Sequence, residues 1–328
     1  MKNKYRHDHF AIRSSDISSA GFLPVFKGAS AIVTGGASGI GRALAGQLAS
    51  RGCEVCLADR QLNAVVEAAA AIRADGGQAT AAHIDVSNYS AVQRVVKEVC
   101  KRSGRLDYMF NNAGVAIGGA LQRHTIDDWN YIVDINLRGV IHGVQAAYQV
   151  MRRQGFGHII NTASMAGLIP APGAVAYATT KYAVVGLSKS LRAEAALDNI
   201  RVSALCPGAI RTPILQAGGK YGKSYANLSA DEERRMWDRL RPMSPDVFAR
   251  KALDAVAMNK SIIVIPSWWK LFWYADRLLP ALTMALSTQS FREFQATDDR
   301  KAQQVRGAIV IRQVDRKATH SGLSISPE

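Results

Sequence analysis

The chain has 328 residues, of which 48% are hydrophobic and 20% are charged, so it is long and apolar enough to bury a sizeable core. This composition excludes a wholly disordered protein. Lys and Arg total 41 against 26 Asp and Glu, and the net charge of +15 favours anionic contacts, although no recognisable nucleic-acid-binding module accompanies it, so we expect no nucleic-acid partner.

The N-terminal 27 residues are mostly polar. Residues 1–27 lack the apolar stretch of a secretory signal peptide, so we expect a mobile arm on a cytoplasmic protein.

From residue 28 to residue 266, short apolar runs alternate with longer segments of helical periodicity. The predicted strands are 29–35, 54–60, 79–86, 106–111, 158–163, 201–205 and 261–265. The predicted helices lie near 40–51, 61–75, 88–103, 125–154, 173–197 and 246–258. This alternation predicts one α/β domain, a Rossmann-type doubly wound parallel sheet of seven strands with helices on both faces and a C-terminal amphipathic extension.

Two of the four cysteines, Cys53 and Cys56, have the CxxC spacing of redox and zinc motifs. They fall in the second predicted strand, and no second CxxC pair follows. We therefore interpret them as small core residues of a protein in a reducing compartment.

A glycine-rich loop follows the first strand and leads directly into a helix. It contains Gly35, Gly39 and Gly41, with Ser38 and Ile40 between them. Such glycines let the backbone approach a pyrophosphate, and the helix N-terminus offers free N–H groups to it. The loop therefore predicts a dinucleotide site.

Asp59 ends the second strand, 18 residues after Gly41. A carboxylate at this distance accepts hydrogen bonds from the adenosine ribose and repels a 2′-phosphate, which favours NAD. Arg60 is adjacent and suits a 2′-phosphate, so NADP stays open as an alternative cofactor.

Tyr177 and Lys181 are four residues apart in the predicted helix 173–197, so they share one helical face. A nearby ammonium stabilises phenolate and lowers the pKa of a tyrosine. The pair thus predicts a general acid/base for an alcohol proton.

Together these motifs resemble the short-chain dehydrogenase/reductase family over residues 28–266. The pattern TGxxxGxG spans 34–41, the family's acidic turn corresponds to Asp85 and Val86, and its NNAG motif corresponds to residues 111–114. The remaining matches are Asn136, Ser164, the YxxxK pair, Pro207-Gly208 and Thr212.

The resemblance implies roles for four catalytic residues. Tyr177 would exchange a proton with the substrate oxygen, which Ser164 would also bind. Lys181 would bind the nicotinamide ribose and depress the pKa of Tyr177. Asn136 would hold a water molecule that links Lys181 to a proton relay.

The resemblance also implies cofactor contacts and no metal. Asp85 and Val86 would face the adenine, and the adenosine portion would lie over Asn112, Ala113 and Gly114. The nicotinamide end would meet Pro207, Gly208, Ile210 and Thr212. His83, His124, His142 and His158 do not pair at ligand spacing, which favours structural or surface roles for them.

Residues 209–245 interrupt the alternation after the sixth strand and are expected to form a substrate lid. They contain Arg211, Lys220 and Lys223, and no Asp or Glu occurs from residue 199 through residue 230. An anionic or acyl-carrier-linked 3-oxoacyl substrate is therefore one alternative.

Residues 267–296 form an aromatic, amphipathic segment, followed by a polar tail at 297–328. The substrate cleft, a second subunit or a membrane interface would cover its apolar side chains. Peripheral membrane contact would imply a lipophilic substrate such as a steroid, a retinoid or another lipid-like alcohol.

Three function classes follow from these observations. The complete catalytic set favours an oxidoreductase of a secondary alcohol or ketone over a silent NAD-binding regulator or a membrane-associated scaffold. The resemblance implies a homodimer or homotetramer built through the helices near 125–154 and 173–197.

Overall fold

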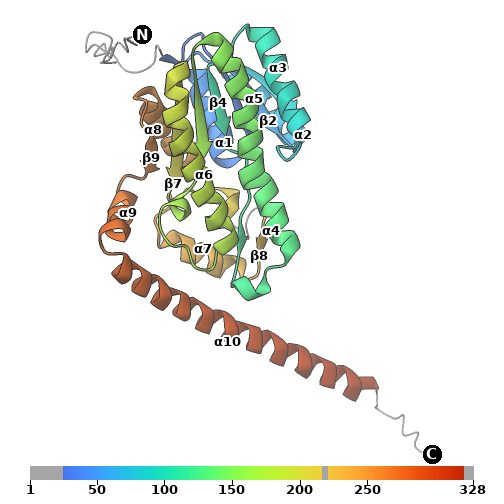
Figure 1. Cartoon of the computed structure of the whole chain (residues 1–328). Coiled ribbons are helices and arrows are strands. Elements are labelled where there is room, and N and C mark those ends of the chain that lie inside the picture. The colour runs from blue at the N-terminus through green and yellow to red at the C-terminus, as the bar shows by residue number, and fades with distance from the viewer. Residues whose placement is uncertain (1–24, 216–220, 321–328) are drawn as a thin grey trace, which may run out of the picture.

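The computed structural model describes residues 25–215 and 221–320. Its centre is an all-parallel sheet of seven strands in the spatial order β3-β2-β1-β4-β6-β7-β9 (Figure 1). The strands are β1 (Ser30–Thr34), β2 (Glu54–Asp59), β3 (Gln78–His83), β4 (Tyr108–Asn111), β6 (Gly157–Thr162), β7 (Ile200–Pro207) and β9 (Ile262–Ile265). All seven predicted strands are confirmed, and the order reverses between β1 and β4, which opens a crevice at their carboxyl ends.

Three helices cover each face of the sheet. One face carries α1 (Gly39–Ser50), α2 (Leu62–Ala74) and α8 (Pro245–Ala257), and the other carries α3 (Tyr89–Ser103), α5 (Gly139–Gln154) and α6 (Val175–Ala195). Side chains alternate between the two cores, as in β1, where Val33 faces one and Ile32 the other. Cys53 and Cys56 are buried and unbridged, one in each core.

The sequence of α3 illustrates why these helices form and where they end. Buried valines at 92, 95, 96 and 99 recur at the spacing of one helical face. Asn88 caps the start by accepting a hydrogen bond from the Ala91 N–H at 3.1 Å. Gly104 ends the helix in the left-handed conformation at φ 69°.

The long helix predicted over 125–154 is divided. It consists of α4 (Ile126–Val133), a π-helical turn (Asp134–Arg138) and α5. Hydrophobic periodicity cannot distinguish a π turn from a continuous helix, since the extra residue shifts the pattern only locally. The turn contains Asn136, which is fully buried.

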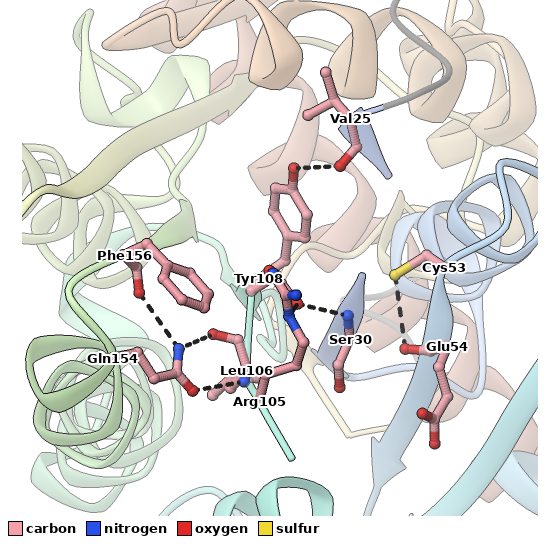
Figure 2. Close-up of polar contacts among 10 residues, drawn as sticks. Val25, Ser30, Cys53, Glu54, Arg105, Leu106, Tyr108, Gln154 and Phe156 are labelled. Carbon is pink, nitrogen blue, oxygen red and sulfur yellow. Dashed lines mark hydrogen bonds and ion pairs between the residues drawn. The ribbon is translucent and has the colours of Figure 1, made fainter. Parts of the chain in front are cut away.

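Polar contacts fix the amino-terminal ends of the strands (Figure 2). Gln154 binds both backbone groups of Leu106, donating to its carbonyl at 3.0 Å and accepting from its N–H at 2.9 Å. Asp107 accepts the Ser30 N–H at 2.8 Å. These contacts stabilise the amino-terminal edge of the sheet. Ligands are expected at the opposite, carboxyl edge.

The last residues of the expected N-terminal arm belong to the folded body. Phe26 is fully buried against Tyr108, with ring centroids 5.1 Å apart, and the Tyr108 hydroxyl donates to the Val25 carbonyl at 3.3 Å. The boundary predicted after residue 27 is therefore too late, because an apolar ring that fills the core was counted with the polar arm. Residues 1–24 lie outside the described residues.

Five further elements lie beyond the carboxyl edge or after the last strand. Short strands β5 (Ile117–Gly118) and β8 (Lys223–Ser224) pair in parallel, and α7 (Ala230–Asp238) follows. After β9 come α9 (Trp269–Leu278) and the long α10 (Pro280–His320), which extends past the body as one straight helix (Figure 1). Within the described ranges, no helix combines the length and apolarity needed to cross a bilayer.

The expected boundary between residues 296 and 297 does not coincide with the end of an element. α10 continues through it, because strong helix formers such as Ala, Gln, Arg and Lys dominate residues 296–306. The polar composition of this stretch predicts a tail, but polar residues suit a solvent-exposed helix equally well. Residues 321–328 lie outside the described residues.

Candidate active site

A cleft of about 1330 Å³ lies at the carboxyl edge of the sheet. The glycine loop, the ends of β2, β4, β6 and β7, and the first turns of α6 contribute its walls. Every predicted site residue lines it except Gly41 and Asn136, which are buried behind its wall. The lining residues among the predicted set are Gly35, Ser38, Gly39, Ile40, Asp59, Arg60, Asp85, Val86, Asn112, Ala113, Gly114, Ser164, Tyr177, Lys181, Pro207, Gly208, Ile210 and Thr212.

The glycine loop passes close to the loop after β4. Gly35 has φ +67°, and a Cβ added to it would lie 2.9 Å from the Ala113 Cα. A Cβ at Gly41 would collide with the Gly35 carbonyl oxygen. Glycine is therefore required at both positions, which supports the interpretation of this loop as a close-approach site.

Thr34 and the start of α1 complete the expected phosphate-binding site. The Thr34 hydroxyl accepts the N–H groups of Asn112 and Ala113 at 2.9 and 3.0 Å, which joins the two loops. The side chain of Ser38, at the N-cap of α1, makes no capping hydrogen bond. The first-turn N–H groups and the positive end of the helix dipole therefore suit a phosphate, so these residues fit a bound dinucleotide.

The Asp59 carboxylate is held in place by backbone donors. It accepts the Ala37 N–H at 3.1 Å and the Gln61 N–H at 2.9 Å, and its side chain faces the cleft. Arg60 lines the same cleft, and its guanidinium lies 4.4 Å from the centroid of the Tyr221 ring, which also lines it. Two backbone donors thus hold the carboxylate in place, and an aromatic ring holds the guanidinium.

Asp85 and Val86 follow β3 on the same side of the cleft. Partial burial acts to raise the Asp85 pKa, but hydrogen bonds from the Ser87 hydroxyl and N–H outweigh it, so the pKa lies below its usual value. The Val86 carbonyl oxygen lies 2.8 Å from the Nδ1 atom of His142, within hydrogen-bond distance. Asp85 is therefore an anionic hydrogen-bond acceptor at neutral pH.

Tyr177 and Lys181 occupy consecutive turns of α6, beside Ser164 at the end of β6. The Lys181 ammonium donates to the Thr162 carbonyl at 2.9 Å and lies 5.5 Å from the centroid of the Tyr177 ring. Ser164 forms a hydrogen bond with the Tyr177 hydroxyl and accepts the Ala166 N–H at 3.1 Å. A phenol, a hydroxyl and an ammonium thus converge on one wall of the cleft.

Burial governs the protonation of this group. It raises the pKa of Tyr177, and the hydrogen bond from Ser164 offsets only part of that effect. It also lowers the pKa of Lys181 to about 8. The expected lowering of the tyrosine pKa is therefore not observed for the protein alone, since the apolar surroundings disfavour both charged forms.

Asn136 fixes the backbone under the site. Its side-chain oxygen accepts the Val115 N–H at 2.8 Å, and its side-chain nitrogen donates to the Val115 carbonyl at 2.9 Å. A Cβ added to Gly114 would lie 3.2 Å from this oxygen and 3.5 Å from the Lys181 ammonium. Asn136 therefore lies within the neighbourhood of Lys181, where the resemblance expects it.

Comparisons with known proteins agree with this geometry. The family model for the short chain dehydrogenases matches residues 29–220, more than half of the chain. The chain belongs to this family. It is therefore an oxidoreductase that acts on alcohol or carbonyl groups.

Individual relatives cover the same region. The chain is 36% identical to meso-2,3-butanediol dehydrogenase of Serratia marcescens over 181 residues, 55% of this chain and 71% of that protein. It is 38% identical to cyclopentanol dehydrogenase of Comamonas testosteroni over 185 residues, 56% of this chain and 74% of that one. A short-chain dehydrogenase from Burkholderia phymatum, solved in complex with NAD, superposes with a TM-score of 0.70 at 29% identity, covering 78% of this chain and 95% of its own.

Within this short-chain dehydrogenase, α9 and α10 add walls to the cleft that the family motifs did not indicate. Trp269 of α9 lies so close to Gly208 that a Cβ on the glycine would overlap its indole. Phe291 and Phe294 of α10 also line the cleft and lie 3.6 and 3.9 Å from a Cβ built at Gly173. The aromatic composition of residues 267–296 was the only signal in the sequence for these contacts.

A buried carboxylate ties α10 to the turn Leu121–Arg123 through an ion pair and to the segment after β8 through a hydrogen bond. Asp298 is 4% exposed and pairs with Arg123 at 2.8 Å. The same carboxylate accepts the Asn227 N–H at 2.5 Å. Lys301 adds an ion pair with Glu232 of α7 at 2.8 Å, so α10 is fixed beside the cleft at two points.

Two of the three cations that suggested an anionic substrate, Arg211 and Lys223, are paired. Arg211 lies 3.2 Å from Asp238, and Lys223 lies 2.5 Å from the fully buried Asp128. Lys220 lies outside the described residues. These pairs neutralise two of the three charges on which the expectation of an anionic substrate rested.

Proposed function

We propose that this chain is an NAD-dependent dehydrogenase/reductase of apolar secondary alcohols and ketones, with Tyr177 as its general acid/base. The observation that supports it most directly is the convergence of Tyr177, Ser164 and Lys181 on one wall of the cleft that the glycine loop also borders. A regulator that only binds a nucleotide has no need of this set.

Each side chain has a separate task in this mechanism. The nicotinamide, when bound, supplies or accepts the hydride. In ketone reduction the Tyr177 hydroxyl donates its proton to the substrate oxygen, and in alcohol oxidation it takes that proton back. The Ser164 hydroxyl orients the same oxygen, Lys181 holds the ribose through its ammonium, and Asn136 keeps the Val115 backbone in place.

The direction of the pKa shifts bears on the pH dependence. Burial raises the pKa of Tyr177, so the neutral phenol that reduction requires predominates at neutral pH. Alcohol oxidation requires the deprotonated form, and its rate should therefore rise with pH.

The preference for NAD is supported by the second strand. Asp59 presents a fixed carboxylate to the cleft, and Arg60 is stacked on Tyr221. A ribose with free hydroxyls suits the carboxylate, whereas a 2′-phosphate would meet a negative charge.

The apolar substrate class is supported by the far end of the cleft. Met236 and Trp237 of α7, Trp269 of α9, and Phe291 and Phe294 of α10 contribute to its lining. Such aromatic and aliphatic side chains are typical of sites for apolar small molecules, and charged side chains that line the same cleft, such as Glu232 and Arg235, would border the substrate. We further propose that residues 209–245 act as the substrate lid.

The test is turnover by Tyr177→Phe with NAD and secondary alcohols of increasing chain length, including cyclopentanol and 2,3-butanediol. We expect a loss of at least ~100-fold in kcat, the usual contribution of general acid/base catalysis, with little change in cofactor affinity. NADH absorbance measures the first quantity and fluorescence titration the second.

Tyr182→Phe is the matched control, since Tyr182 lies on the same helix, is exposed and does not line this cleft. It should retain normal turnover. Near-normal turnover of Tyr177→Phe would refute the mechanism.

We also propose that the chain forms a homodimer or homotetramer through α5 and α6, the helices that the family resemblance indicates. Light scattering at micromolar concentration should give the mass of two or four chains. A single-chain mass would contradict this assembly.

A further inference from the structure

α9 has apolar side chains on both of its sides. Trp269 and Trp273 pack against the core of the domain. On the other side, Leu271 is 72% exposed and Leu278 78% exposed, with Phe272 exposed between them. Exposed leucine and aromatic side chains on a second side of a helix are normally covered by another surface, and the described residues provide none for the outer side of α9.

The exposed apolar surface continues onto the first turns of α10. Residues 278–291 include no charged residue, and four leucine or methionine side chains in this stretch after Leu278 are exposed. Here we call the whole surface the apolar face: Trp268, Leu271, Phe272, Tyr274, Leu278, Leu279, Leu282, Met284 and Leu286. Single exposed apolar residues are ordinary, but a group on two consecutive helices marks an interaction surface.

Cations border this face. Arg277 is exposed in the last turn of α9, and Arg292 is exposed where the uncharged stretch ends, followed by the exposed Glu293. Asp276 is half-buried and accepts a hydrogen bond from the Thr283 hydroxyl at 2.9 Å. Leucines with Trp and Tyr, flanked by exposed arginines, are the composition of a helix that lies in the interface of an anionic bilayer.

The apolar face is continuous with the substrate cleft. Trp269 lines the cleft and stacks on the exposed Trp268 at 4.8 Å, and it also contacts the exposed Phe272 at 5.5 Å between ring centroids. Phe291 and Phe294 line the cleft from the same α10 whose preceding turns carry the face. Apolar side chains therefore lead from the outer surface to the cleft wall.

Charge distinguishes a bilayer from a second copy of the chain. In a contact of the face with a second copy, both partners carry the net charge of +15, which opposes their association. An anionic lipid surface complements the same charges. Charge and composition therefore both favour the bilayer.

We propose that α9 and the first turns of α10 dock the protein on the surface of an anionic phospholipid bilayer, with the apolar face at the level of the headgroups and upper acyl chains. The cleft then receives its apolar substrate from the lipid phase, a point that rests on the function proposed above. Docking itself does not depend on catalysis.

Sedimentation of the full chain with phospholipid vesicles tests the docking. We expect at least ~10-fold more protein to sediment with phosphatidylserine/phosphatidylcholine vesicles at low salt than with phosphatidylcholine alone. Salt at about 1 M should reduce the difference, because it shortens the screening length to about 3 Å.

The triple variant Leu271→Glu/Leu278→Glu/Leu282→Glu should remain in the supernatant with anionic vesicles. Its three positions are exposed and do not line the cleft, so the fold should tolerate the changes. The matched control is Leu197→Glu, because Leu197 is 92% exposed and lies outside α9 and α10. It should sediment like the wild type.

Two results would overturn the proposal. If the wild-type protein stays in the supernatant with anionic vesicles at low salt, lipid docking is excluded. If, in addition, the triple variant has a lower mass than the wild type in light scattering, a second copy of the chain covers the face. Unchanged sedimentation of the triple variant excludes this face as the contact. Turnover of a short, water-soluble secondary alcohol should be equal in wild type and triple variant, so failure of docking and failure of the proposed activity are distinguishable.

Discussion

Protonation of Tyr177 and Lys181 depends on burial as much as on their mutual distance. The two side chains share a helical face, yet the low polarity around them raises one pKa and lowers the other. Sequence spacing indicates which groups meet, whereas their charge states depend on how much of the surrounding wall is apolar. The Asp59 carboxylate, in contrast, is bound by two backbone N–H groups.

Asp59→Asn tests the cofactor preference at the residue scale. Removing the negative charge should narrow the preference for NAD over NADP by about tenfold, since a charge pair near a protein surface is worth roughly 1 to 4 kcal/mol. The ratio of kcat/KM for the two cofactors measures the change.

Asp75→Asn is a suitable control, because this exposed acid follows α2 and does not line the cleft. A wild-type enzyme that already prefers NADP would contradict the role assigned to Asp59.

At the scale of elements, the middle of α10 forms part of the cleft wall and is anchored to the domain by an ion pair. Its side chains reach the cleft at Phe291 and Phe294, and Asp298 follows one turn later with a buried ion pair to Arg123. Removal of one partner from such a pair leaves an unpaired charge in a buried position, which is costly. The position of the aromatic wall should therefore depend on this carboxylate.

Asp298→Ala should raise the KM for long apolar alcohols several-fold and change the KM for a short alcohol much less, because only the long substrates reach α10. Steady-state kinetics with an alcohol series measures both values. Asp299→Ala is the matched control, since Asp299 is largely exposed and lies 3.8 Å from the same arginine. Equal effects of the two substitutions would show that the buried pair has no special part in positioning α10.

At the scale of the whole molecule, one buried histidine couples stability to pH. His158 in β6 is 3% exposed, and its ring lies 2.8 Å from the Ser203 hydroxyl. Burial, with Arg201 and Arg192 nearby, lowers its pKa to about 3. The folded protein therefore keeps this ring neutral where the unfolded chain would protonate it.

Between pH 6.5 and pH 3 the unfolded state binds the extra proton, so the free energy of unfolding should fall as the pH is lowered through this range. The contribution of His158 to the slope is at most about 1.4 kcal/mol per pH unit. Urea unfolding at several pH values measures it, and His158→Gln should have a shallower slope than the wild type.

His83→Gln, at an exposed histidine of β3, should leave the slope unchanged. A His158→Gln slope equal to that of the wild type would mean that other groups cause the acid sensitivity.

The sequence by itself determined the seven strands, the helices between them and the residues that meet in the cleft. Alternation of apolar runs and turns reports local structure directly, and parallel strands bring their carboxyl ends to one edge whatever the details of packing. Gly35, Gly39, Tyr177 and Lys181 could therefore be placed without coordinates.

Only the tertiary structure decided the π turn that contains Asn136, the burial that sets the pKa values of Tyr177 and Lys181, and the return of Trp269, Phe291 and Phe294 to the cleft. These features depend on contacts between residues far apart in the chain. An apolar periodicity states that a side chain will be covered but does not identify what covers it. Some apolar side chains of α9 and α10 line the cleft. Those on the outer side are exposed, and we propose that a surface outside the chain covers them.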